Sequence, residues 1–286
     1  MKHPFRLAGL CLLIALPLLA QNPAPTHRDV AYDDADKAQA VDAYLVESDS
    51  PMPVMVYIHG GGWRAGSKNR IPQWLRKGVD EKVFSVVSVE YRFTDVKPHP
   101  AQVNDCLHAI QFVRHKAKEW NLDPKRIGVT GGSAGGHLSL YVGLHGDKAK
   151  ADSKDPVERH SSRVQCAVGF AGPTDWSLLK EIEHRHPAYR QLVGSEPGTP
   201  VEKMDAKAMK TVSPISFVSK DDPPIMIVHG DADDVVPVEH GRRLQKELKK
   251  AGVEVEMVII KDGKHNVAGA GAGGADEAMA FVKKHL

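Results

Sequence analysis

Short apolar segments alternate with longer amphipathic segments from residue 53 onward, and this alternation constrains the fold more than any other feature of the sequence. The apolar segments are rich in β-branched residues, which is typical of strands buried on both faces. In the stretch 101–120, Val103, Leu107 and Ile110 recur at the spacing of one helix face. This alternation predicts an α/β fold with a mostly parallel central sheet and helices on both faces. We expect buried strands at 53–58, 84–89, 126–130, 164–170, 224–228 and 253–260, two edge strands within 29–46, and helices at 101–120, 133–144, 239–251 and 275–285.

The interval 173–222 separates the sixth and seventh expected strands but has little strand character of its own. Several prolines interrupt it, so its helical pieces must be short. Trp176 and Tyr189 are large apolar side chains that a disordered linker would leave exposed. We therefore expect a small, ordered, lid-like insertion over the edge of the sheet.

The first twenty residues have the layout of a secretory signal peptide. Lys2 and Arg6 are followed by an uncharged, leucine-rich run over 7–20 and then by a polar, turn-prone break. We expect cleavage after Ala20, which would make residues 21–286 a single catalytic domain, secreted or periplasmic, with no stable membrane insertion. An uncleaved N-terminal anchor is the alternative.

Charge and cysteine content narrow the possible partners. Lys and Arg number 38 against 36 Asp and Glu, a net charge of +2, so the sequence gives no reason to expect nucleic acid. Outside the leader the cysteines are Cys106 and Cys166, neither in a C-x-x-C pair. We expect two buried thiols, although export would permit a disulfide. We expect no metal and no cofactor.

The pentapeptide at 131–135, Gly-Gly-Ser-Ala-Gly, lies where an expected strand ends and an expected helix begins. In this context G-x-S-x-G indicates a serine on a tight turn, with small neighbours that let the chain fold sharply. The unpaired N–H groups at the start of the helix favour negative charge there. Ser133 is therefore the candidate nucleophile.

A second glycine-rich segment, His-Gly-Gly-Gly-Trp at 59–63, also follows a buried strand. Attack on an ester carbonyl places negative charge on its oxygen, and backbone N–H groups stabilise that charge. We assign this oxyanion hole to Gly61, Gly62 and Ala134, with the Trp63 N–H as a possible replacement for one glycine. A phosphate-binding loop is less favoured, because the lysine and Ser/Thr of a P-loop are missing.

A serine hydroxyl needs a general base, and His265 is the leading candidate because it follows the last expected strand. The loop after the preceding strand offers Asp231, Asp233 and Asp234 as the acid that orients it. The order Ser, Asp, His along the chain is the order expected for this arrangement. The residues alone leave the three aspartates open.

Taken together, the motifs resemble those of α/β-hydrolase esterases, in particular bacterial feruloyl- and acetyl-xylan-esterase-like enzymes and hormone-sensitive-lipase-like carboxylesterases. The resemblance extends from about residue 50 to the C-terminus. It is carried by HGGGW at 59–63, EYR at 90–92, GGSAGG at 131–136 and the loop HGDADDVVP at 229–237. By that resemblance the acid is Asp233, Asp231 is a turn residue, and Asp234 stands where similar proteins often carry proline.

The expected activity is hydrolysis of carboxylic esters through an acyl-enzyme intermediate. The expected substrate is a small-molecule ester or a polysaccharide-linked acetyl or feruloyl ester, and a serine peptidase or amidase with the same triad is the alternative. Trp63 and Trp176 are candidates for lining the substrate opening, with core packing as the other possibility. Glu183, His184 and His186 could form a metal cluster, but we expect surface side chains on the insertion instead.

Overall fold

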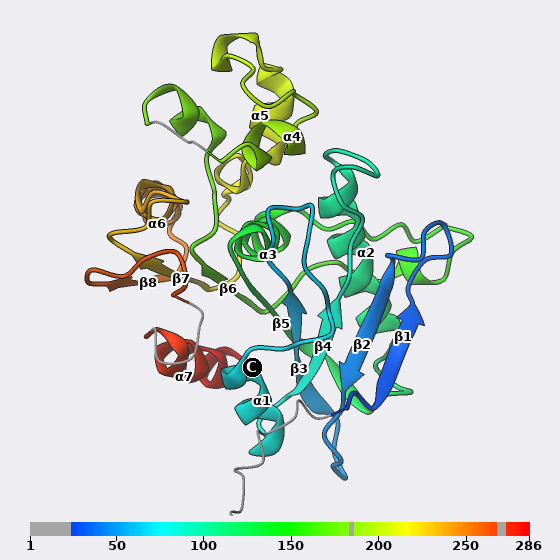
Figure 1. The fold of residues 1–286 in the computed structure, drawn as a ribbon. Helices are drawn as coiled ribbons and strands as arrows, with labels where there is room; N and C mark the ends of the chain where they lie inside the picture. Colours follow the sequence, from blue (N-terminus) through cyan, green and yellow to red (C-terminus); the bar gives the residue numbers. More distant parts are fainter. Residues whose placement is uncertain (1–23, 183–185, 268–272) are drawn as a thin grey trace, which may run out of the picture.

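A computed structural model describes residues 24–182, 186–267 and 273–286 and shows one eight-stranded sheet (Figure 1). The strand order is β1-β2-β4-β3-β5-β6-β7-β8. β1 and β2 join the sheet antiparallel, and all pairs from β4 to β8 are parallel. The strands are β1 His27–Ala31, β2 Ala40–Tyr44, β3 Met52–Ile58, β4 Ser85–Val89, β5 Leu122–Gly132, β6 Cys166–Phe170, β7 Ile225–Gly230 and β8 Val255–Ile260. The predicted fold class is confirmed.

The central strands consist of residues that can be buried on either face, and every residue of β4, β6 and β7 is buried. Their register aligns the carboxyl ends, because Ile58 pairs with Gly131 and Phe170 pairs with Gly132. The loops that follow β3, β5 and β6 therefore start at one edge of the sheet, where ligands of open α/β sheets bind.

Helices cover both faces of the sheet (Figure 1). On one face α2, α3 and α6 pack over a core that includes Leu107, Leu138 and Leu244. On the other face α1 and α7 pack over a core that includes Leu75 and Phe281. The bounds are α1 Gln73–Asp80, α2 Ala101–Lys116, α3 Ala134–Leu144, α6 Glu239–Ala251 and α7 Ala275–His285, with a short 3-10 helix η1 at Val157–Arg159.

The helix α1 was not expected from the sequence. It is short, and Gly78 within it lowers the helix propensity. A Cβ at Gly78 would lie 2.2 Å from Cζ of Phe84, so the glycine lets the helix approach the residue before β4. Tertiary packing against Phe84 therefore stabilises a segment whose local signal is weak.

The insertion between β6 and β7 consists of short helices, as expected, and lies beyond the carboxyl edge of the sheet (Figure 1). Its Trp176, Tyr189 and Leu192 are buried. The pieces are η2 Trp176–Lys180, α4 Ala188–Leu192, η3 Val201–Lys203, α5 Ala206–Val212 and η4 Pro214–Phe217.

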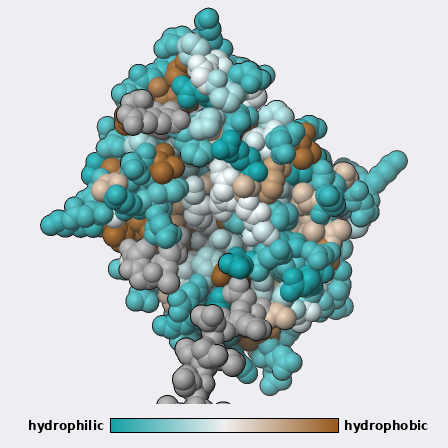
Figure 2. Space-filling model, viewed as in Figure 1, coloured by the Kyte–Doolittle hydropathy of each residue, from teal (hydrophilic) through white to brown (hydrophobic). Residues whose placement is uncertain are grey.

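Three of the residue ranges and side chains named from the sequence cannot be compared with the structure. The expected signal peptide at 1–20 lies outside the described residues, as do Glu183 and His184. Cys106 and Cys166 are free, buried thiols. In the described ranges no helix is both long enough and apolar enough to cross a membrane. On the face drawn in Figure 2, hydrophobic residues form scattered patches within a mostly hydrophilic surface.

Candidate active site

Ser133 sits on the sharp turn between β5 and α3, with φ of 57° and ψ of −121°. A non-glycine residue adopts this region only at a cost in free energy, and such strain is typical of functional turns. The flanking glycines make the turn possible: a Cβ at Gly131 would lie 2.4 Å from the Ile58 carbonyl oxygen, and one at Gly135 would lie 2.0 Å from it. The Ser133 N–H donates to the Phe170 carbonyl at 2.8 Å, which fixes the turn against β6.

His265, from the loop after β8, lies between Ser133 and Asp233. Its Nε2 is 2.8 Å from the Ser133 Oγ, and its Nδ1 is 2.9 Å from the Asp233 Oδ2. These distances give an Nδ1–H that donates to the carboxylate and an Nε2 placed to accept the hydroxyl proton. The structure thus brings together three side chains that are up to 132 residues apart in the chain.

The Asp233 carboxylate is held in its charged form. Burial alone would raise its pKa, but hydrogen bonds from His229 and His265 and from the Val236 N–H outweigh burial and lower the pKa below the ordinary value. Its Oδ1 accepts the N–H groups of Val235 and Val236, each at 2.9 Å. His229, which the sequence presented only as the end of a strand, has its Nε2 3.5 Å from the Asp233 Oδ2.

The other two aspartates of this loop have different surroundings. Asp231 accepts the Asp262 N–H at 2.6 Å and so ties the β7 loop to the loop that carries His265. Asp234 is an exposed residue. Of the three candidates, Asp233 is the one in contact with His265.

The HGGGW loop is held by its first residue. His59 Nε2 lies 2.6 Å from the Glu90 Oε1, and the His59 ring stacks on Tyr91 at 4.5 Å between centroids. The remaining residue of the EYR motif, Arg92, pairs with the buried Asp105 of α2. The motif therefore anchors the loop and the helix beside it, a role that the sequence did not reveal.

The backbone of this loop has left-handed values at Gly61 (φ 113°), Gly62 (φ 61°) and Trp63 (φ 58°). A Cβ at Gly61 would lie 1.9 Å from the Ala65 carbonyl oxygen, so only glycine fits. Gly61 and Gly62 line the same cavity as Ser133, and Ala134 begins α3 directly after it. The expected oxyanion donors thus lie around the candidate nucleophile.

The two tryptophans take different positions, one of the two that the sequence left open for each. Trp176 is fully buried, donates its Nε1–H to the Tyr189 carbonyl at 3.1 Å, and does not line the cavity, so its assignment to substrate binding is corrected to core packing. Trp63 does line the cavity but is only 2% exposed. Its Nε1–H donates to Nδ1 of the buried His137 at 3.1 Å, which ties the glycine loop to α3.

The cavity at Ser133 has a volume of about 440 Å³ and is lined mostly by apolar side chains. The insertion supplies part of the wall through His186, Ala188 and Tyr189. His186 was expected on the surface of the insertion and instead faces this cavity. Nothing in the sequence near His186 signals this position, because the contact depends on how the insertion folds back.

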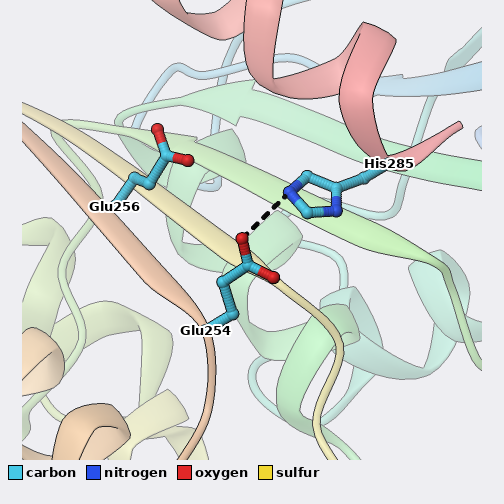
Figure 3. Close-up of side chains that lie close together, drawn as sticks. All are labelled: Glu254, Glu256 and His285. Carbon is cyan, nitrogen blue, oxygen red and sulfur yellow. Dashed lines mark ion pairs between the residues drawn. The ribbon is translucent and has the colours of Figure 1, made fainter.

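A separate group of Glu254, Glu256 and His285 gathers where β8 begins and α7 ends (Figure 3). It lies at the edge of the sheet opposite Ser133, since β8 runs parallel to the central strands. The Lys284 ammonium is 2.6 Å from Glu254 and 3.8 Å from Glu256, so a protein cation already occupies the space between the two carboxylates and offsets part of their charge. We assign it to joining α7 to β8.

A mostly parallel eight-stranded sheet, a serine on a strand-to-helix turn, and an aspartate and a histidine after the last two strands define an α/β hydrolase. The chain belongs to the BD-FAE family, whose sequence model matches residues 41–248. The matched range includes Ser133 and Asp233 and ends before His265.

Solved structures and curated sequences agree with this placement. A carbohydrate esterase from gut microbiota superposes with a TM-score of 0.78 at 28% identity, covering 90% of this chain and 94% of that one. An acetyl ester-xyloside bifunctional hydrolase from Caldicellulosiruptor lactoaceticus superposes with a TM-score of 0.74 at 28% identity, covering 93% and 94%. The probable carboxylic ester hydrolase LipM of Mycobacterium tuberculosis is 29% identical over 78% of this chain and 51% of its own length. The chain thus spans about half the length of this curated relative.

Proposed function

We propose that this protein hydrolyses carboxylic esters through an acyl-enzyme intermediate on Ser133. The observation that carries the proposal is the continuous contact from Asp233 through His265 to Ser133, beside a cavity that also holds Gly61 and Gly62. A serine hydroxyl in this setting is activated by the imidazole, whose orientation the carboxylate fixes.

In the first half-reaction His265 Nε2 accepts the Ser133 proton while Oγ forms a bond to the ester carbonyl carbon. The N–H groups of Gly61, Gly62 and Ala134 stabilise the resulting oxyanion, each by about 3–4 kcal/mol. The carbon–oxygen bond to the alcohol then breaks, and His265 returns the proton to the leaving oxygen. In the second half-reaction His265 accepts a proton from water as the water oxygen bonds to the acyl carbon. The bond from that carbon to the Ser133 Oγ then breaks, His265 returns the proton to Oγ, and the carboxylic acid leaves.

We propose short-chain acyl esters on carbohydrates, acetyl esters above all, as the substrate class. The names of two similar structures, a carbohydrate esterase and an acetyl ester-xyloside hydrolase, support this proposal. The cavity also supports it, because about 440 Å³ must hold the acyl group and the first part of the alcohol together.

The test is a panel of p-nitrophenyl acetate through decanoate with acetylated xylan and methyl ferulate, assayed on the wild type and on Ser133→Ala. We expect the wild type to favour the shortest acyl chain and Ser133→Ala to lose activity by about 10⁶-fold. If the wild type cleaves none of the panel, or if Ser133→Ala retains full activity, the proposal fails.

We also propose that residues 1–20 direct export and that the protein acts outside the cytoplasm. The basic start and the leucine-rich run at 7–20 support this proposal. The intact mass of protein recovered from the periplasm or medium should correspond to a chain that begins at Gln21. A mass that includes Met1 would contradict cleavage.

A further inference from the structure

A second cavity, of about 450 Å³, lies next to the one that contains Ser133. The two share a wall, because Arg64 of the second cavity directly follows Trp63 of the first. Gln191 of the second cavity likewise lies on α4, the helix that supplies Ala188 to the first. The Arg64 Nη1 donates to the Gln191 Oε1 at 3.0 Å on the side of this wall that faces the second cavity. A group that leaves the catalytic cavity on this side therefore meets the Arg64–Gln191 pair.

The second cavity is built on a fixed frame. The Thr94 N–H donates to the Trp63 carbonyl at 2.9 Å, and the His99 N–H donates to the Leu192 carbonyl at 2.8 Å. The loop between β4 and α2 thus holds both the glycine-rich loop and α4 in place. These backbone hydrogen bonds help to fix the distance between the two cavities.

His186 stands on the catalytic side of the same wall. A Cβ at Gly62 would lie 3.4 Å from the His186 Cε1, so the ring packs directly on the oxyanion loop. Its Nδ1 accepts the Ala188 N–H at 3.2 Å, which places the proton of the neutral ring on Nε2. Partial burial, together with the positive charge of Arg64 and the proximity of a second imidazole, lowers the pKa of His186, so the ring is a neutral donor at pH 7. A hydrogen-bond donor in a largely apolar cavity is suited to an oxygen of the substrate.

The second cavity differs from the first in its polar lining. Asp95 and Glu196 lie at this cavity, and within the described ranges neither carboxylate takes part in an ion pair. Guanidinium, amide and carboxylate groups offer paired donors and acceptors that match the neighbouring hydroxyls of a sugar ring. An acyl chain would gain nothing from such a surface, because it would desolvate these groups without bonding to them.

We propose that His186 and the Arg64–Gln191 pair bind the sugar that carries the ester, and that the polysaccharide continues into the cavity with Asp95 and Glu196. This proposal rests on the proposed esterase function and adds the site that receives the alcohol portion of the substrate. It assigns the insertion a role in selecting carbohydrate esters over simple esters.

The kinetic test compares kcat/KM for acetylated xylo-oligosaccharide with kcat/KM for p-nitrophenyl acetate, which has no sugar. In Gln191→Leu and His186→Phe we expect the ratio of the two to fall about tenfold through a higher KM for the oligosaccharide. His186→Gln retains a donor and should recover part of the ratio. The control is Lys246→Ala. Lys246 lies on α6 and lines a different cavity, so this variant should have the same ratio as the wild type.

An equal fall on both substrates would show a structural role for these residues and overturn the proposal, as would an unchanged ratio. A second measurement needs no hydrolysis: xylohexaose binding to Ser133→Ala by titration calorimetry. We expect saturable binding that Gln191→Leu weakens about tenfold, and absence of saturable binding overturns the proposal. A wild type inactive on the whole ester panel, acetylated xylan included, would instead refute the esterase function, and the calorimetry would still test the sugar site.

Discussion

Asp233 shows how one side chain acquires its role from contacts that its neighbours in the chain lack. Asp231 and Asp234 have the same chemistry and lie within two residues of it. Only the Asp233 carboxylate is enclosed, with two backbone N–H groups on Oδ1 and His265 on Oδ2. These bonds keep the carboxylate charged and fix the tautomer of His265 that a general base requires.

Asp233→Asn should lower kcat on p-nitrophenyl acetate by about 10³–10⁴-fold, because an amide cannot stabilise the protonated imidazole and favours the wrong tautomer. The matched control is Asp234→Asn, at an exposed position in the same loop, which should retain wild-type kcat. Equal losses in the two variants would show that the loop, and not the carboxylate at 233, governs activity.

His137 is a buried residue of α3, four positions after Ser133, and takes no part in the proposed mechanism. Burial lowers its pKa to about 3, against the opposing effect of its hydrogen bond to the Val212 carbonyl. The unfolded chain takes up a proton at this histidine near pH 6.5, whereas the folded chain stays neutral down to about pH 3. Above pH 6.5 His137 is neutral in both states and does not alter the free energy of unfolding. Below pH 6.5 protonation of His137 stabilises the unfolded chain alone, so the free energy of unfolding falls.

Urea unfolding should reveal this loss. Between pH 6.5 and pH 5 the contribution of His137 is on the order of 2 kcal/mol. The free energy of unfolding of the wild type should therefore fall more steeply over this interval than that of His137→Gln, which cannot be protonated. Parallel pH profiles for the two proteins would contradict the assignment.

Among the elements, the turn from β5 into α3 depends most strictly on its glycines. Gly135 lies in the first turn of α3, where a Cβ would meet the Ile58 carbonyl oxygen at 2.0 Å and the His59 carbonyl oxygen at 2.7 Å. Both obstacles are backbone atoms, which cannot move without shifting β3. Close approach of α3 to β3 is what aligns Ser133 with the HGGGW loop.

Gly135→Ala should lower the free energy of unfolding by about 3 kcal/mol and reduce activity, since β3 or α3 must shift to accommodate the methyl group. Gly146→Ala, two residues beyond the end of α3, is the control because no atom lies within 4 Å of the added Cβ. Chemical denaturation of both variants gives the comparison. A Gly135→Ala protein as stable as Gly146→Ala would refute the packing argument.

For the whole molecule, the sheet separates two apolar cores and also separates the two thiols. Cys106 belongs to the core under α2, and Cys166 belongs to the core under α1 and α7. Burial raises the pKa of Cys166 to about 12 and holds the pKa of Cys106 well above its ordinary value. A disulfide between these two residues would have to pass through the sheet.

Protein that lacks residues 1–20 should therefore react with Ellman's reagent at no thiol while folded and at two thiols in denaturant. Reducing agent should leave its thermal unfolding midpoint unchanged. Rapid modification of the folded protein, or fewer than two thiols in denaturant without reductant, would contradict the free, buried state of Cys106 and Cys166.

The sequence alone predicted the parallel sheet, the helices on both faces and the position of the nucleophile, because these depend on local patterns. A buried strand needs a run of β-branched residues, and the turn at Ser133 needs small residues at fixed spacing, so both features are visible in a few consecutive positions. The contact of His265 with Ser133 and with an aspartate of the preceding loop was also predicted, since loops after parallel strands meet at one edge of the sheet. Among the aspartates, family resemblance was needed to favour Asp233.

The tertiary structure decided what depends on contacts between distant segments. Trp176 and His186 lie in the same insertion, yet the first is in the core and the second faces the cavity. The roles of Glu90 and His229 likewise follow from partners that they meet only in the folded chain. A local pattern records whether a side chain is suited to burial, whereas the side chain that it meets is set by how the insertion and the loops pack across the sheet edge.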